Sequence, residues 1–203
     1  MLPLATVWAT TFVEQPFPET VQEAPIIARG KVGMRYADWA QGTDGKRRIY
    51  TYTELRVDEV LKGKVAGQNV MMRELGGEKD GVGMQIAGSA EFEKGEDVVV
   101  FLQPPNQDGT HTLQGMMMGK YNVRQDPGGQ EYLEGAGLSS HTNPALRGKE
   151  NLIHPEESHG DTGASKYPIQ TLRDLIRGQS QGADAQAQDP VTAGKPSPSP
   201  SAL

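Results

Sequence analysis

Residues 48–58 carry the strongest periodic pattern in the chain, a strict alternation of two kinds of side chain. One face of an extended segment would hold Ile49, Thr51, Thr53, Leu55 and Val57, and the other Tyr50, Tyr52, Glu54, Arg56 and Asp58. A period of two residues with many β-branched and aromatic side chains is typical of a long antiparallel strand with one buried face. The alternation breaks at residues 59–61, before a turn at Lys62 and Gly63. We therefore expect a β-bulge that bends this strand.

Several other segments have strand character, and turn-forming residues separate them. The predicted strands are 26–32, 48–58, 69–75, 97–102 and 112–118 continuing through 121–123, with short pieces at 83–87 and 130–133. Chain reversals are expected at 42–46 and 126–129, which are rich in Gly and Asp. The apolar run 98–102 does not alternate, so both of its faces should be buried at the centre of the sheet. The pattern predicts an all-β fold, a small antiparallel barrel of about six strands over residues 16–134.

Two short helices are predicted outside the strands. Thr20 and Glu23 have the spacing of a capping box before Pro25, which indicates a one-turn helix within residues 16–25. At 168–178 a proline opens a segment with apolar residues at helical spacing and a glycine at its end. We expect this C-terminal segment to form an amphipathic helix docked on the barrel.

Two polar segments show no periodicity. Residues 135–167 are rich in Gly, Pro and Ser, which predicts an extended surface loop. Residues 179–203 carry too few apolar side chains to offset the entropy of ordering, which predicts a disordered tail.

The first 15 residues indicate export. Residues 1–9 are apolar and end in small side chains before a polar stretch, as at the end of a secretory signal. We expect a signal remnant, with an ordinary N-terminal arm as the alternative, and hence a secreted or periplasmic location. No run reaches the ~20 apolar residues of a membrane span, so none is predicted.

Composition excludes several classes of function. A chain of 203 residues without cysteine has no disulfides, no thiolate metal ligands and no thiol nucleophile. The net charge of −6 and the lack of a large Lys or Arg patch disfavour nucleic acid as a partner. We expect one core and no cofactor. We also expect no enzyme activity, because no Gly-x-Ser-x-Gly motif is present and the glycine-rich segment 76–83 lacks the Gly-Lys-Ser/Thr ending of a phosphate-binding loop.

Histidines and methionines supply candidate metal ligands. His154 and His159 lie five residues apart with His141 upstream, but Pro155 forbids a regular helix that would align them. Solvated loop histidines are the preferred interpretation, with metal binding as the alternative. The methionines at 71–72 and 116–118 are soft ligands suited to Cu(I), although filling of the core explains them better.

Aromatic residues supply the candidate partner-binding surface. Tyr36, Trp39, Tyr50 and Tyr52 are expected to form an aromatic outer face on the first two long strands, next to the loop at 76–83. Ordinary cross-strand packing is the alternative explanation.

Three segments carry a resemblance to a known group of proteins. Residues 24–32, 49–63 and 92–102 resemble a set of exported bacterial proteins of unassigned function with an OB/netrin-like barrel. They are more distantly similar to the tissue inhibitors of metalloproteinases. Those inhibitors bind the protease zinc through an N-terminal cysteine and are braced by disulfides, and this chain has no cysteine. The resemblance therefore implies the fold and not the inhibitory mechanism.

Together these patterns predict a non-enzymatic, exported binding domain that contacts another protein in the envelope or outside the cell. A protease-associated inhibitor-like or chaperone module is one alternative, with an exported protease as the candidate partner. A metal-binding protein that uses His141, His154 and His159 is the other.

Overall fold

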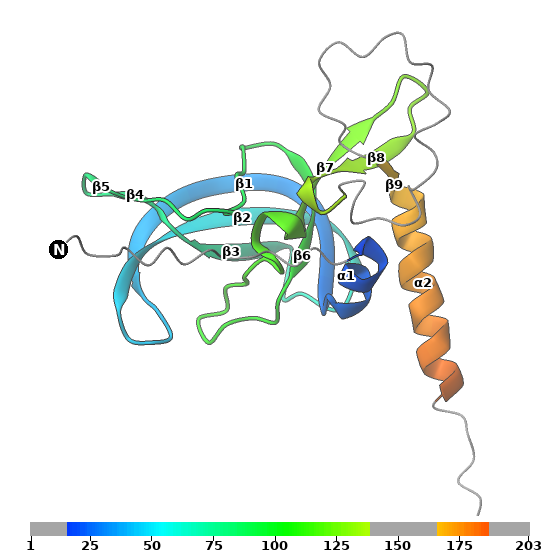
Figure 1. The fold of residues 1–203 in the computed structure, drawn as a ribbon, viewed down its shortest axis with the longest axis horizontal. Coiled ribbons are helices and arrows are strands. Elements are labelled where there is room, and N and C mark those ends of the chain that lie inside the picture. Colours follow the sequence, from blue (N-terminus) through cyan, green and yellow to red (C-terminus); the bar gives the residue numbers. More distant parts are fainter. Residues whose placement is uncertain (1–15, 139–165, 187–203) are drawn as a thin grey trace, which may run out of the picture.

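A computed structural model describes residues 16–138 and 166–186, and it confirms a β-rich fold with a C-terminal helix. Seven strands form one antiparallel sheet in the order β3-β2-β1-β6-β7-β8-β9 (Figure 1). The strands are β1 Ile26–Gln41, β2 Arg47–Lys62, β3 Asn69–Leu75, β6 Asp97–Leu102, β7 Lys120–Gln125, β8 Glu131–Glu134 and β9 Tyr167–Pro168. A separate hairpin consists of β4 Gly77–Lys79 and β5 Val82–Met84. The helices are α1 Phe17–Glu23 and α2 Ile169–Gln186, with single 3₁₀ turns at Met116–Gly119 and Ala136–Leu138.

The long hairpin of β1 and β2 dominates the molecule, and Figure 1 shows both strands as curved ribbons. Each is 16 residues long, so the predicted first strand continues nine residues beyond Val32. The pairing register shifts between Ile27 and Ala28 and between Arg29 and Gly30, because Leu61 and Asp58 of β2 have no partner on β1, which confirms the predicted bulge in β2. At Gly30 an added Cβ would collide with the backbone carbonyl of Arg56. The two backbones can approach so closely only because this residue has no side chain.

Strand β6 is buried on both faces, as its lack of alternation predicts. Val99 and Phe101 belong to a core beneath the helices, while Val98, Val100 and Leu102 belong to a second core. We call the first the helix-side core and the second the inner core. The inner core also contains Leu55, Val70, Met72 and Phe92, and every one of these side chains is at most 3% exposed. β6 is the central strand of the seven, and it separates the two cores because one lies on each of its faces.

The two helices cover one end of the sheet. Phe17 of α1 packs against Phe101, Tyr121 and Tyr167, with ring centroids 5.9, 5.3 and 4.7 Å away. The predicted docking of α2 is confirmed, because Leu172 and Ile176 are buried in the helix-side core. The predicted capping box is wrong, because Thr20 lies inside α1 and its hydroxyl donates back to the carbonyl of Pro16.

The end of α2 also differs from the prediction. The helix continues past Gly178 to Gln186, so the first eight residues of the predicted tail are helical. A helix-interior glycine costs only about 1 kcal/mol relative to alanine, and the residues that follow it include good helix formers such as Ala183 and Ala185. Of the predicted loop, 136–138 and 167 are ordered in a 3₁₀ turn and in β9, whereas 139–165 lie outside the described residues, as do 1–15 and 187–203.

The methionine-rich segment is not a strand, which corrects the prediction for residues 112–118. Gly115 and Met116 both have positive φ angles, +69° and +58°, and residues 116–119 form a 3₁₀ turn. A strand cannot continue through two left-handed residues. Met117 is 40% exposed, whereas Met72 is fully buried, so the expectation of core filling holds for Met72 and not for Met117.

Residues 110–114, which come directly before this turn, bridge β3 and β6. His111 bridges Met72 in parallel orientation, and the backbone N–H groups of Arg73 and His111 each donate across the bridge at 2.8 Å. Leu113 bridges Leu102 of β6 in antiparallel orientation. Within the described ranges the seven named strands themselves form an open series that ends at β3 and β9 rather than a closed barrel.

No helix in the described part of the chain is long and apolar enough to cross a membrane.

Candidate functional site

Three of the four predicted aromatic residues lie together on the outer face of the long hairpin. Tyr36 of β1 stands directly opposite Tyr52 of β2, and Asp38 stands opposite Tyr50. Residues opposite one another in an antiparallel pair project to the same face. The rings of Tyr36 and Tyr52 stack with centroids 5.1 Å apart and an angle of 13° between their planes. Tyr36 is 43% exposed, so the stacked pair offers an aromatic surface to solvent.

Trp39 lies on the other face, which corrects the expectation of one shared aromatic surface. It stands opposite Ile49, the neighbour of Tyr50 in sequence. An odd spacing of three residues from Tyr36 places the two side chains on opposite faces of a strand. The indole N–H of Trp39 donates to Asp80 at 2.9 Å, in the turn between β4 and β5. Trp39 therefore holds the hairpin at 77–84 in place.

Arg73, for which no sequence pattern indicated a role, ties the tyrosines to the loop after β6. It stands opposite Tyr52, and its guanidinium lies 4.4 Å from the ring centroid of Tyr50. The same guanidinium donates to Asp108 at 2.6 Å. The hydroxyl and backbone N–H of Thr110 also donate to Asp108, at 2.6 and 3.0 Å. These bonds from Thr110, followed by the charge of Arg73, hold the pKa of Asp108 below its ordinary value, so its carboxylate is ionised at neutral pH.

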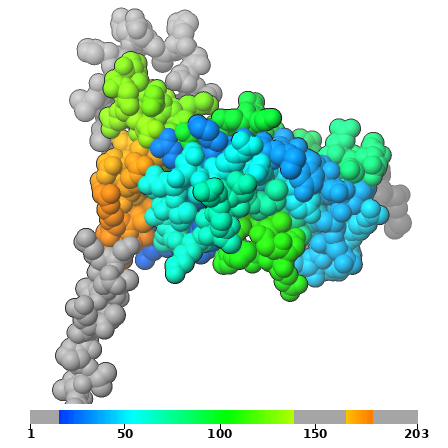
Figure 2. Space-filling view, turned by 180° about the vertical axis from the view of Figure 1, so that it is seen from behind, coloured from blue at the N-terminus to red at the C-terminus, as the bar shows by residue number. Residues whose placement is uncertain are grey.

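A groove of about 800 Å³ lies beside this cluster. Its walls are the β1–β2 loop, the loop after β6 and the side chains of Tyr52 and Arg73. Arg48 fixes the first loop by two bonds of 2.6 Å to Asp44, and those bonds lower the pKa of Asp44 to about 2. Seen from behind, the green loop after β6 projects beside the cyan and blue parts of the long hairpin (Figure 2). We refer to this site as the tyrosine groove.

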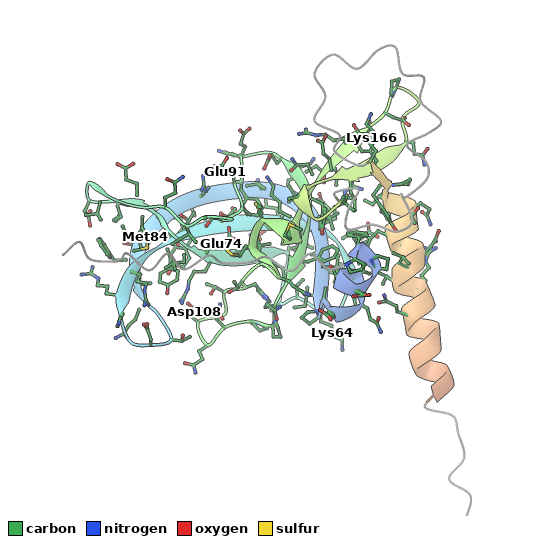
Figure 3. The ribbon with its side chains drawn as sticks, in the orientation of Figure 1. Lys64, Glu74, Met84, Glu91, Asp108 and Lys166 are labelled. Atoms are coloured by element: carbon green, nitrogen blue, oxygen red, sulfur yellow. The ribbon has the colours of Figure 1, made fainter. Side chains whose placement is uncertain are left out.

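A second, smaller pocket of about 200 Å³ lies on the inner face of the same strands. Figure 3 labels Glu74, Met84 and Glu91, which are among its lining residues. Glu74 is largely buried, and this burial raises the pKa of its carboxyl to about 7, against the opposing influence of Arg35 and Lys120. The sequence contained a signal for this site, because Glu74 occupies the same strand face as Val70 and Met72, where an apolar residue is expected.

The three histidines predicted as candidate metal ligands, His141, His154 and His159, fall in a part of the chain that the structure does not describe. His111 lies inside the described residues, only 5% exposed, with its ring Nδ1 2.9 Å from the carbonyl oxygen of Gln103. In residues 16–138 and 166–186 no group of three His, Cys, Asp or Glu side chains could hold a metal ion.

Comparison with known proteins gives no relative, because no family model, no curated protein and no solved structure matches the chain. The proposal for function therefore depends on the geometry of the sites described above.

Proposed function

We propose that this protein is a non-enzymatic binding domain that holds an extended segment of a partner protein in the tyrosine groove. The observation that carries the proposal is the stacked Tyr36–Tyr52 pair at the edge of an 800 Å³ groove. Tyrosine, arginine and methionine are enriched at protein interfaces. Besides Tyr36, this part of β1 exposes Met34, whose exposed fraction is 55%.

Preorganisation of the groove supports binding. Arg73 is held between the ring of Tyr50 and the carboxylate of Asp108, and only 15% of its side chain is exposed. Side chains that are fixed before binding lose less conformational entropy when a partner arrives. The groove therefore presents a surface of defined shape.

The proposed fold places the groove at a position suited to ligands. We propose that β1, β2, β3, residues 110–114 and β6 form an OB/netrin-like barrel, in which the bridges at His111 and Leu113 close the ring. The support is the pairing sequence, since β1 pairs with both β2 and β6 and the 110–114 segment bridges β3 and β6. In OB barrels, ligands bind over the second and third strands, between the loop joining strands one and two and the loop joining strands four and five. The tyrosine groove has these walls.

The charges around the groove favour a protein over a nucleic acid. Among the described residues, the only charged side chains that line the groove, Arg73 and Asp108, neutralise one another, so its walls carry no net positive charge, and the chain as a whole has a net charge of −6. Proteins that bind single-stranded nucleic acid use a positively charged groove along the phosphate backbone. We also propose that the protein is exported, on the basis of its apolar first nine residues.

Site-specific photocrosslinking in the organism that encodes the chain would test the proposal. A photoreactive phenylalanine at position 36 is expected to form a covalent adduct with a protein, and the adduct should disappear when Tyr52 is replaced by alanine. The matched control is the same group at Val82, an apolar residue of β5 that is 47% exposed. Equal adducts from both positions, or no protein adduct from position 36, would contradict the proposal.

An oligosaccharide is the second candidate ligand, and the composition of the loop after β6 supports it. Asn106, Gln107 and Asp108 line the groove opposite an aromatic ring, and OB barrels also bind oligosaccharides at this position. A glycan array separates the candidates, since binding that requires Tyr52 would select the sugar.

A further inference from the structure

The side chain of Glu74 is largely buried, whereas its carboxylate oxygens still reach the pocket and pair with no described residue. Glu74 stands opposite Thr51, on the same face of β3 as the fully buried Met72. Among the described residues, no donor forms a hydrogen bond to its carboxylate and no cation lies within ion-pair distance. Buried carboxylates are normally paired, because removing an ion from water costs several kcal/mol. An unpaired one beside a cavity therefore indicates a missing partner.

The cations nearest to Glu74 do not supply this partner. The ammonium of Lys120 donates to the backbone carbonyl of Glu91 and, at 2.8 Å, to the carboxylate of Glu96. It also lies 4.8 Å from the ring centroid of Phe92, so it is held away from Glu74. Arg35 acts on Glu74 through its charge only, since its exposed side chain forms no ion pair with any described residue.

The pocket in front of Glu74 is suited to a group that donates hydrogen bonds. Thr51 uses its hydroxyl proton on the carbonyl of Gly76 at 2.8 Å, so its oxygen offers only lone pairs to the pocket. Glu91 also lines the pocket, as do the donors Arg35, Gln85 and Ser89. A volume of about 200 Å³ accommodates a small head group and lies below the ~300 Å³ at which drug-sized ligand sites begin.

We propose that this pocket binds a primary ammonium or guanidinium group, supplied by a lysine or arginine side chain of a partner or by a small free amine. The proposal does not depend on the tyrosine groove, which lies on the other face of the strands.

The proposal predicts a defined pH dependence. The charged groups that face Glu74 are Arg35 from β1, Lys120 from β7 and Glu91 from the loop before β6. Because the pKa of Glu74 is raised to about 7, its carboxyl is mostly protonated at pH 6 and mostly ionised at pH 8. An ammonium or guanidinium stays protonated throughout this range. Affinity for the cation should therefore rise from pH 6 to pH 8.

NMR titration of the Glu74 side-chain carboxyl in the full chain tests the proposal. The probes are Nα-acetyl-lysine methylamide, Nα-acetyl-arginine methylamide, butylamine and guanidine, with Nα,Nε-diacetyl-lysine methylamide as the uncharged control. A saturating cationic probe is expected to lower the titration midpoint of Glu74 by about one pH unit, which corresponds to tenfold tighter binding to the ionised form. The uncharged control should leave the midpoint unchanged.

Three variants sharpen the test. Glu74→Gln should abolish binding of every probe, whereas Glu19→Gln on the distant α1 should leave it intact. Arg35→Gln should strengthen binding several-fold, because it removes the competing charge. The probes also distinguish the two sources: binding of the blocked amino acids supports a side chain of a partner, while binding of butylamine or guanidine alone supports a small free amine.

Three results would each overturn the proposal. The first is a Glu74 midpoint at or below 4.5 that no probe moves, which would mean that Arg35 closes onto the carboxylate. The second is equal binding of the charged and uncharged lysine derivatives, and the third is binding that survives Glu74→Gln.

Discussion

Arg73 and Glu74 are neighbours on β3, yet their charged groups lie on opposite faces of the strand and differ in whether they have a partner. Arg73 points to the outer face, where the ring of Tyr50 and the carboxylate of Asp108 both contact its guanidinium. Glu74 points to the inner face, where burial raises its pKa and no described residue pairs with it. One step along a strand thus separates a satisfied charge from an unsatisfied one. The outer face thus holds its charge by two contacts, whereas the inner pocket leaves open the position at which we propose that a cation binds.

The two adjacent methionines of β3 give the largest expected contrast between the faces. Met72→Ala should cost about 2–5 kcal/mol in free energy of unfolding, because it opens a cavity in the inner core. Met71→Ala, on the half-buried outer face, should cost about 1 kcal/mol or less. Urea denaturation of both variants measures the contrast. Equal losses would mean that the two faces of β3 are not buried as described.

Glu74→Gln should stabilise the protein at alkaline pH. Since the pKa of the folded state is raised from 4.5 to about 7, the protonated form is the one that folding favours. The wild type therefore loses stability as the pH rises from 4.5 to 7, and the variant does not. The gain should be near zero at pH 4 and reach about 3 kcal/mol at most above pH 7. Thermal unfolding at pH 4 and pH 8 checks this, and a gain of equal size at both values would refute the assignment.

The pairing of Arg73 with Asp108 should appear as a coupling energy of about 1–2 kcal/mol in a double-mutant cycle with alanine. The matched control is the exposed pair of Arg124 and Glu134, 3.3 Å apart, for which about 0.5 kcal/mol or less is expected. Because the pKa of Asp108 is lowered, its coupling is present at neutral pH and is lost as the pH falls through that pKa. Similar couplings for the two pairs would show that the outer face is not preorganised.

Tyr36→Ala should have the smallest effect on stability, about 0.5 kcal/mol, because the ring that stacks on Tyr52 is partly exposed. Tyr36→Phe keeps the stacking and should match the wild type. Chemical denaturation of the three proteins makes the comparison. A loss of several kcal/mol for Tyr36→Ala would mean that this tyrosine serves the fold rather than a binding surface.

The elements that have local causes could be predicted from the sequence. Alternation over 48–58, the uniform run 98–102 and the glycine-rich turn at 42–46 each predicted a feature that the structure contains. These patterns succeed because side chains alternate across a strand and because turns need particular backbone angles. The same period of two places Trp39 and Tyr36 on opposite faces of β1. The wrong prediction of one shared aromatic face was therefore avoidable from the spacing of the two residues alone.

The pairing of polar groups, by contrast, could not be predicted before the fold was known. Arg73 and Asp108 are 35 residues apart, and the parallel bridge between Met72 and His111 aligns their two segments. No local pattern encodes this contact, nor the partial burial of Glu74 without a partner. The left-handed turn at Met116 likewise replaces a strand that the side-chain types favoured. Desolvation and long-range pairing depend on segments that meet only when the chain is folded, and so the Arg73–Asp108 contact at the tyrosine groove and the unpaired state of Glu74 became visible only in the structure.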